Sequence, residues 1–214
     1  MTNPLSTILI LLLSIALALS WPSPSRASSD FSSTARSLDR HFKLLANSRN
    51  STLTKLQIYI HADFLVGSKT QTVFEVASCD ITAKSPGFYG RVYVIDNPLT
   101  VTADPGSEYL GRYQGTNVYS DFREPAANMN MAMTFEGGIY EGSTMSIFGR
   151  QPVNEEVRIL SVVGGTGIFR LAKGVVLART VSLDPITKVG HYVYVIYVLT
   201  PAAAAAGGAM AAAA

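Results

Sequence analysis

The stretch SVVGGTGIFRLAKG, residues 161–174, decides the fold class, because it places four glycines within fourteen residues. Such a segment either holds a phosphate between a strand and a helix or turns the chain between two strands. A dinucleotide-binding loop has the pattern GxGxxG, but Arg170 occupies the third glycine position here. The residues that follow alternate and are interrupted by Gly174, which is typical of a strand. The stretch therefore predicts a strand, a tight turn at Gly164 and Gly165, and a second strand.

The same strand-like pattern continues on both sides of this stretch. Short apolar or alternating runs continue through residues 55–200, with no sustained helical repeat between them. Turn signals such as Asp96-Asn97-Pro98 separate the runs. Strands without crossover helices predict an all-β domain, an antiparallel barrel or sandwich. The expected strands are Leu56–Val66, Thr72–Cys79, Phe88–Asp96, Gly111–Tyr119, Met129–Phe135, Thr144–Phe148, Val157–Val163, Phe169–Thr180 and His191–Thr200.

The last of these runs favours a barrel. His191–Thr200 is apolar on both faces, so something other than water must cover each face. One face can line the interior of a barrel, and a flanking element or a second subunit can cover the other. We therefore expect a homo-oligomer, a dimer or a trimer.

The N-terminal residues indicate secretion. The apolar run Ile8–Leu19 is too short to cross a bilayer core of about 30 Å as a helix and has the length of a signal-peptide core. We expect residues 1–20 to be a signal peptide, with cleavage possible as late as residue 27 and an uncut anchor as the alternative. The prediction is an extracellular protein that is not embedded in a membrane.

The remaining terminal segments have weaker patterns. Residues 21–54 are interpreted as a flexible leader, in which Ser33–Ala46 either forms a short helix with Leu38 and Phe42 on one face or is disordered. Residues 201–214, mostly Ala and Gly, are expected to be a disordered tail. Asn50 begins an N-glycosylation acceptor pattern.

Composition excludes several classes of function. The formal net charge of +2 provides no basic stripe for nucleic acid. Three histidines and the single Cys79 form no cluster with metal-ligand spacing, and one cysteine cannot form an intramolecular disulfide. No cofactor motif and no nucleophile elbow are present. We expect neither a metal nor a cofactor.

Three blocks in register resemble the plant dirigent family. They are the opening stretch, GRYQG at residues 111–115, and EGSTMSIFG at residues 141–149. The resemblance runs from about Lys55 to Leu199. It implies an eight-stranded antiparallel β-barrel, secreted to the plant cell wall and assembled into oligomers. It also implies binding of phenoxy radicals, which a separate oxidase (laccase or peroxidase) forms from alcohols such as coniferyl alcohol, and control over how they couple.

The resemblance also indicates site residues. Arg158 matches a family arginine, whereas the two family aspartates are missing, because Ala62 and Gln151 occupy their positions. Asp63 lies one residue beyond the first of these positions, so it reaches the cavity only if a bulge re-aims it. Asn117 replaces a tyrosine that often occurs in the family. The candidate catalytic residues are Arg158 and Asp63, and the candidate substrate-binding residues are His61, Tyr113, Asn117 and Gln151.

Structural roles are the alternative for each of these residues. His61 in an apolar strand is typical of a hydrogen-bonded core histidine, and Arg158 can pair with Glu155 or Glu156 at the surface. Tyr113 can be barrel packing. Two other functions also stay open: a cyclase that acts on a quinone methide, and a wall or defence protein that binds phenolics or glycans without catalysis.

Overall fold

The computed structural model describes residues 24–202, which form one helix, nine strands and two short 3-10 turns. The predicted signal peptide at residues 1–20 and nearly all of the predicted tail at 201–214 lie outside the described residues. Within the described range, no helix is long and apolar enough to cross a membrane. In chain order the elements are α2 (Pro24–Arg49), β1 (Ser51–Asp63), β2 (Val73–Ala77), β3 (Val92–Thr100), β4 (Tyr109–Tyr119), β5 (Ala126–Phe135), η1 (Gly138–Tyr140), β6 (Thr144–Pro152), β7 (Arg158–Thr166), η2 (Gly167–Phe169), β8 (Lys173–Leu183) and β9 (Val189–Pro201).

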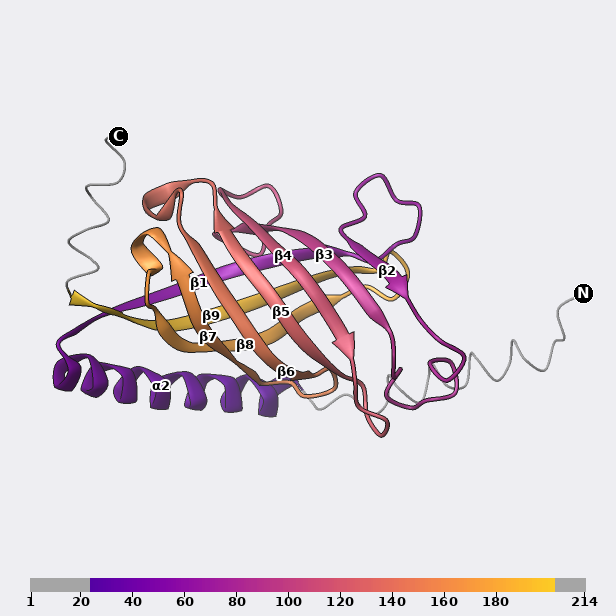
Figure 1. Ribbon diagram of the computed structural model, residues 1–214, viewed down its shortest axis with the longest axis horizontal. Coiled ribbons are helices and arrows are strands. Elements are labelled where there is room, and N and C mark those ends of the chain that lie inside the picture. Colours follow the sequence, from indigo (N-terminus) through magenta and orange to yellow (C-terminus); the bar gives the residue numbers. More distant parts are fainter. Residues whose placement is uncertain (1–23, 203–214) are drawn as a thin grey trace, which may run out of the picture.

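The strands form one closed antiparallel sheet (Figure 1). Their order is β1-β9-β8-β7-β6-β5-β4-β3-β2, and β1 also pairs with β3, where Ile60 lies opposite Leu99. This second pairing closes an eight-stranded barrel, which consists of β1 and the seven strands from β3 through β9. β2 is an extra strand beside β3. The prediction of an eight-stranded antiparallel barrel is confirmed.

The glycine-rich stretch turns the chain later than predicted. Gly164 and Gly165 lie inside β7, opposite Ser146 and Met145, and the chain turns only at η2. A register shift in the β6–β7 pairing adds one residue to β7 just before the glycines. A Cβ atom on Gly165 would lie 2.3 Å from the backbone oxygen of Thr144, so this strand position requires glycine. The prediction of strand, turn and strand is correct, but its turn position is wrong.

The predicted turn at Asp96-Asn97-Pro98 is also wrong, because these residues lie inside β3 and pair with β4. Proline is tolerated there because its missing N–H faces a gap in the sheet. On that side of β3, pairing with β2 ends at Ile95 and pairing with β1 begins at Leu99. No ladder hydrogen bond is therefore lost at Pro98.

Helix α2 covers the outer face of β8 and β9 (Figure 1). The rings of Phe42 and Tyr197 lie 5.7 Å apart, and the Tyr197 hydroxyl donates a hydrogen bond to the Ala35 backbone oxygen at 2.8 Å. The expected flexible leader at residues 21–54 thus contains a helix longer than Ser33–Ala46 and the first residues of β1. The physical reason is the double apolar face of β9, which a flanking element covers. The oligomer stays a prediction, without support from this face.

One end of the barrel is filled with side chains. Met133, Met145 and Phe169 are completely buried there. The ring of Phe169 lies 5.4 Å from that of Phe135 and 5.3 Å from that of Tyr140. These aromatic contacts close the end of the barrel that carries η1 and η2.

Candidate functional site

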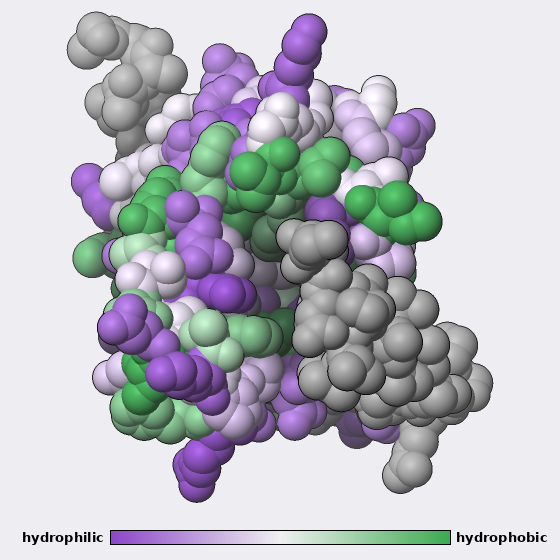
Figure 2. Space-filling view, turned by 90° about the vertical axis from the view of Figure 1, so that its right-hand side faces the viewer, coloured by the Kyte–Doolittle hydropathy of each residue, from purple (hydrophilic) through white to green (hydrophobic). Residues whose placement is uncertain are grey.

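The other end of the barrel is hollow. A cavity of about 720 Å³ opens where β4, β6 and β8 end, and all eight barrel strands contribute to its lining. The surface is hollowed between hydrophobic residues when it is viewed onto this end (Figure 2). Alternate residues of each strand face inward, so each strand contributes one side of its pleat to the lining.

Five polar atoms of the cavity wall are buried and have no hydrogen-bond partner within residues 24–202. Buried polar atoms in folded proteins nearly always have a partner, because leaving one unpaired costs about 1–3 kcal/mol. The residues that carry these atoms line one cavity and have unused hydrogen-bonding capacity there. The atoms are Asn97 Oδ1, Tyr113 Oη, Asn117 Oδ1, Gln151 Oε1 and Arg158 Nε.

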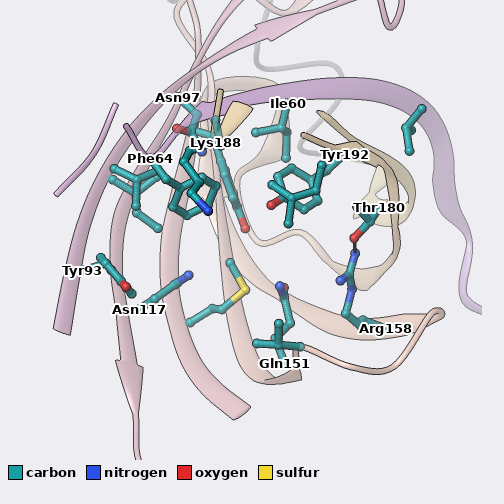
Figure 3. A pocket seen from close by; sticks show the side chains of 18 of the residues that line it. Ile60, Phe64, Tyr93, Asn97, Asn117, Gln151, Arg158, Thr180, Lys188 and Tyr192 are labelled. Carbon is teal, nitrogen blue, oxygen red and sulfur yellow. Dashed lines mark hydrogen bonds between the residues drawn. The ribbon is translucent and has the colours of Figure 1, made fainter. Parts of the chain in front are cut away.

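Arg158 supplies a fixed positive charge inside the barrel. Its side chain is 4% exposed, and one terminal nitrogen donates to Thr180 Oγ1 at 2.9 Å. The guanidinium carbon lies 5.9 Å from the centre of the Tyr192 ring. Among the described residues, no carboxylate forms an ion pair with Arg158, so the predicted surface alternative with Glu155 or Glu156 is wrong. The guanidinium faces the cavity together with Thr180 and Tyr192 (Figure 3).

Tyrosines form much of the remaining wall. The rings of Tyr113 and Tyr194 meet edge to face at 5.5 Å. Burial raises the pKa of Tyr113 well above its ordinary value, and it raises that of Tyr192 to about 12. Both hydroxyls therefore keep their protons at neutral pH and can donate hydrogen bonds to a ligand.

Asp63 does not reach the cavity. The pairing of β1 with β9 continues without a bulge to Asp63 opposite Val189, so Ala62 faces inward and Asp63 faces outward. The Asp63 carboxylate accepts hydrogen bonds from the Leu65 N–H and from the hydroxyls of Ser68 and Thr70, each at 2.8 Å. These bonds, led by that of Leu65, hold its pKa below the ordinary value. The structure therefore removes Asp63 from the candidate catalytic residues.

His61 also lies on the outer side of β1. Its Nδ1 lies 2.7 Å from Nδ1 of His191, and its Nε2 lies 2.6 Å from Thr100 Oγ1. Burial lowers the pKa of His61, and the neighbouring His191 adds to this effect. His61 is thus a hydrogen-bonded histidine at the seam where β1 meets β3, and the expectation that it binds substrate in the cavity is wrong.

The other predicted residues do meet in the cavity. Tyr113, Asn117 and Gln151 line it together with Arg158, and Figure 3 shows Asn117 and Arg158 on opposite walls with Gln151 between them. Asn50, the predicted glycosylation position, is an exposed residue after α2, with a φ of 47°. Glycosylation there stays a prediction.

Sequence reasoning missed Asn97 and Thr180. Ile95, Asn97 and Leu99 occupy alternate positions of β3 and so share one face of the strand. This alternation was missed because Asn97 and the proline after it were interpreted as a turn. Thr180 had no signal of its own, because its role depends on its contact with Arg158. Across residues 24–202, no three His, Cys, Asp or Glu side chains lie close enough together to hold a metal ion.

Comparison with known proteins places this barrel in a family. A family model described as "Dirigent-like protein" matches residues 53–199, nearly all of the barrel. The chain belongs to the dirigent family. It is 41% identical over 148 residues to Dirigent protein 23 of Arabidopsis thaliana. The aligned region covers 68% of this chain and 78% of that protein. It is 37% identical over 137 residues to Pterocarpan synthase 1 of Glycine max, over 64% of this chain and 73% of that one.

A solved dirigent structure agrees with this assignment. The structure of a pterocarpan synthase dirigent protein matches with a TM-score of 0.63 at 34% identity, over 70% of this chain and 90% of that chain. The dirigent barrel is thus the common element, while α2 lies before the residues that the family model matches.

Proposed function

We propose that this dirigent-family protein is secreted and binds phenoxy radicals of the monolignol type, which a separate laccase or peroxidase forms. It directs the faces and carbons at which two radicals couple, as in lignan formation, and does not oxidise them itself. The observation that carries the proposal is the apolar, tyrosine-rich cavity with five buried polar atoms that have no partner among the described residues.

Control of coupling requires orientation more than a reactive side chain. Radicals couple without a nucleophile, so a protein selects the product by holding the two rings in one relative pose. A volume of about 720 Å³ lies in the range of small-molecule sites, about 300–1,000 Å³. Tyrosine rings can contact the guest rings, and the polar atoms on the two walls can fix oxygen atoms at the two ends of a guest.

Chiral analysis of the coupling products tests this function. Coniferyl alcohol is oxidised by a laccase with and without the purified protein, and the dimers are separated by chiral chromatography. We expect one enantiomer of one regioisomer to be enriched only when both proteins are present. The heat-unfolded protein is the control. A racemic mixture that folded protein leaves unchanged would contradict the proposal.

A cyclase that acts on a quinone methide is the second candidate, supported by the likeness to proteins named pterocarpan synthases. Arg158 and the Tyr192 hydroxyl can donate hydrogen bonds to a carbonyl oxygen as it gains negative charge. Within the described lining, Asp184 at the mouth is the one carboxylic acid, and it accepts the N–H groups of Ile186 and Thr187. Turnover of a quinone methide without any oxidase would support this candidate, whereas product bias that requires the laccase supports the first.

A further inference from the structure

The charges that line the cavity do not balance. Arg158 is the one charged side chain buried in the described lining, while Lys188 and Asp184 are exposed at the mouth and have opposite signs. The inward positions next to Arg158 hold neutral groups, Gln151 and Thr180 among them. A buried guanidinium without a counter-charge is costly, because its charge has left water and has gained no partner.

Within residues 24–202, no carboxylate forms an ion pair with Arg158. Asp63 faces outward and holds its own loop. The negative charge that would pair with Arg158 must therefore come from the guest.

The opposite wall has a different chemistry. Asn97 and Asn117 lie across the cavity from Arg158 (Figure 3), and their buried amide oxygens have no partner within residues 24–202. A carboxamide can accept the proton of a phenol or donate to a phenoxy oxygen. This wall therefore suits the uncharged hydroxyl end of a phenolic guest, and the Arg158 wall suits an anionic end.

We propose that the cavity selects a 4-hydroxycinnamate, with its carboxylate on Arg158 and its phenol against Asn97 and Asn117. The inference rests on the proposed function, because it concerns the guest of the same cavity, and it changes the preferred guest from an alcohol of the monolignol type to the corresponding acid. A carboxylic acid is ionised at neutral pH, whereas a phenol with a pKa of about 10 is not, so the carboxylate is the end that supplies the charge. An alcohol such as coniferyl alcohol fits the same shape but leaves Arg158 without a counter-charge.

Calorimetric titration with two ligands tests this choice. Ferulate and coniferyl alcohol share the same substituted ring and differ at the last carbon, which is a carboxylate in one and a CH₂OH group in the other. At pH 7 we expect ferulate to bind at least about ten-fold more tightly, as for a charge-assisted pair in a buried site. Equal affinity, or tighter binding of the alcohol, would overturn the inference.

Three variants identify the charge responsible. Arg158→Gln should reduce the preference for ferulate to about two-fold or less, and Arg158→Lys should retain most of it. Lys173→Gln removes one positive charge from an exposed position at the filled end of the barrel, so it should leave the preference unchanged. A preference that survives in Arg158→Gln, or one that Lys173→Gln reduces equally, would contradict the assignment. Melting temperatures check that each variant is folded.

The outcomes separate this inference from the proposed function. If coniferyl alcohol binds as tightly as ferulate and its coupling is still biased, the anionic guest is wrong and the steering function stands. If neither ligand binds, both are wrong. Tighter ferulate binding that depends on Arg158 supports both the site and its charge selectivity.

Discussion

Among single residues, Asp63 has a carboxylate that holds the loop after β1 by hydrogen bonds and does not reach the cavity. It is 8% exposed, and its oxygens accept one N–H and two hydroxyl groups from the loop that follows β1. Since these bonds favour the charged form, the pKa of Asp63 is lowered, and the stabilisation is present above the ordinary value of 3.8 and is lost as the pH falls through the lower folded value.

Replacing Asp63 should therefore affect stability and not product bias. Asp63→Ala leaves the Leu65 N–H without its acceptor and should lower the free energy of unfolding by about 2 kcal/mol at pH 7. Asp80→Ala, at an exposed position, should change it by less than about 0.5 kcal/mol. Urea denaturation measures both changes. A stable Asp63→Ala protein that no longer biases coupling would return Asp63 to the site.

His61 and His191 form a hydrogen-bond chain with Thr100, in which the direction of each bond follows from the Thr100 hydroxyl. The Thr100 hydroxyl donates to the Thr102 backbone oxygen at 2.7 Å, so it must accept from Nε2–H of His61. Nδ1 of His61 then has no proton and accepts from Nδ1–H of His191. A second proton on His61 would break this bond. The charge of Asp104 raises the pKa of His61, but burial and His191 lower it more.

The seam should therefore weaken in acid. Because the folded pKa of His61 lies below its ordinary value of 6.5, the unfolded chain binds the proton more readily. Stability therefore falls as the pH drops from 6.5 toward the lower folded pKa. His61→Gln should lower the free energy of unfolding at pH 8 by about 1–2 kcal/mol and flatten its decline toward pH 5. His41→Gln, at an exposed position on α2, should behave like the unchanged protein. Equal slopes in all three proteins would contradict a lowered pKa of His61.

At the scale of elements, β7 shows why two adjacent glycines have different requirements. A Cβ on Gly164 would meet no atom within 4 Å, whereas a Cβ on Gly165 would lie 2.3 Å from the Thr144 backbone oxygen and 2.8 Å from Cβ of Phe169. The bulge at this point in the β6–β7 pairing turns Gly165 inward, toward the filled end of the barrel.

Alanine substitutions at these two positions should therefore have different effects on the free energy of unfolding. Gly165→Ala must displace backbone and should lower the free energy of unfolding by more than about 2 kcal/mol. Gly164→Ala should stay within about 0.5 kcal/mol of the parent or be slightly more stable, since alanine restricts the unfolded chain. Thermal and urea unfolding give both values. Similar losses at the two sites would show that the glycines act through chain flexibility and not through close contact.

Sequence patterns predicted the strands better than the connections. Alternation and turn residues located most of the elements, because each strand must present one face to the interior. The pattern could not show that β1 closes onto β3, and this closure is why Pro98 sits in a strand. Nor could it show that β9 provides the contact that orders α2, because the helix depends on packing against Tyr197.

At the scale of the whole molecule, the barrel divides into a filled half and a hollow half. Large side chains such as Met133, Met145 and Phe169 fill one half completely. In the other half, Ala62 and polar side chains such as Asn117 leave space that no side chain of residues 24–202 occupies. Family positions predicted Asn117, Gln151 and Arg158 but not Asn97 or Thr180. The one-residue difference between Ala62 and Asp63 needed the register of β1 to resolve it.

The proposed function requires that this hollow half receives a phenolic guest. Its most direct test is the NMR spectrum of protein labelled at the methionine methyl groups during titration with coniferyl alcohol or ferulate. Met129 lines the cavity, whereas Met133 and Met145 lie in the filled half. We predict a saturable shift of the Met129 methyl signal and little change at Met133 and Met145. An unchanged Met129 signal at saturating ligand, or equal shifts at all three methionines, would contradict binding of the guest in the hollow half.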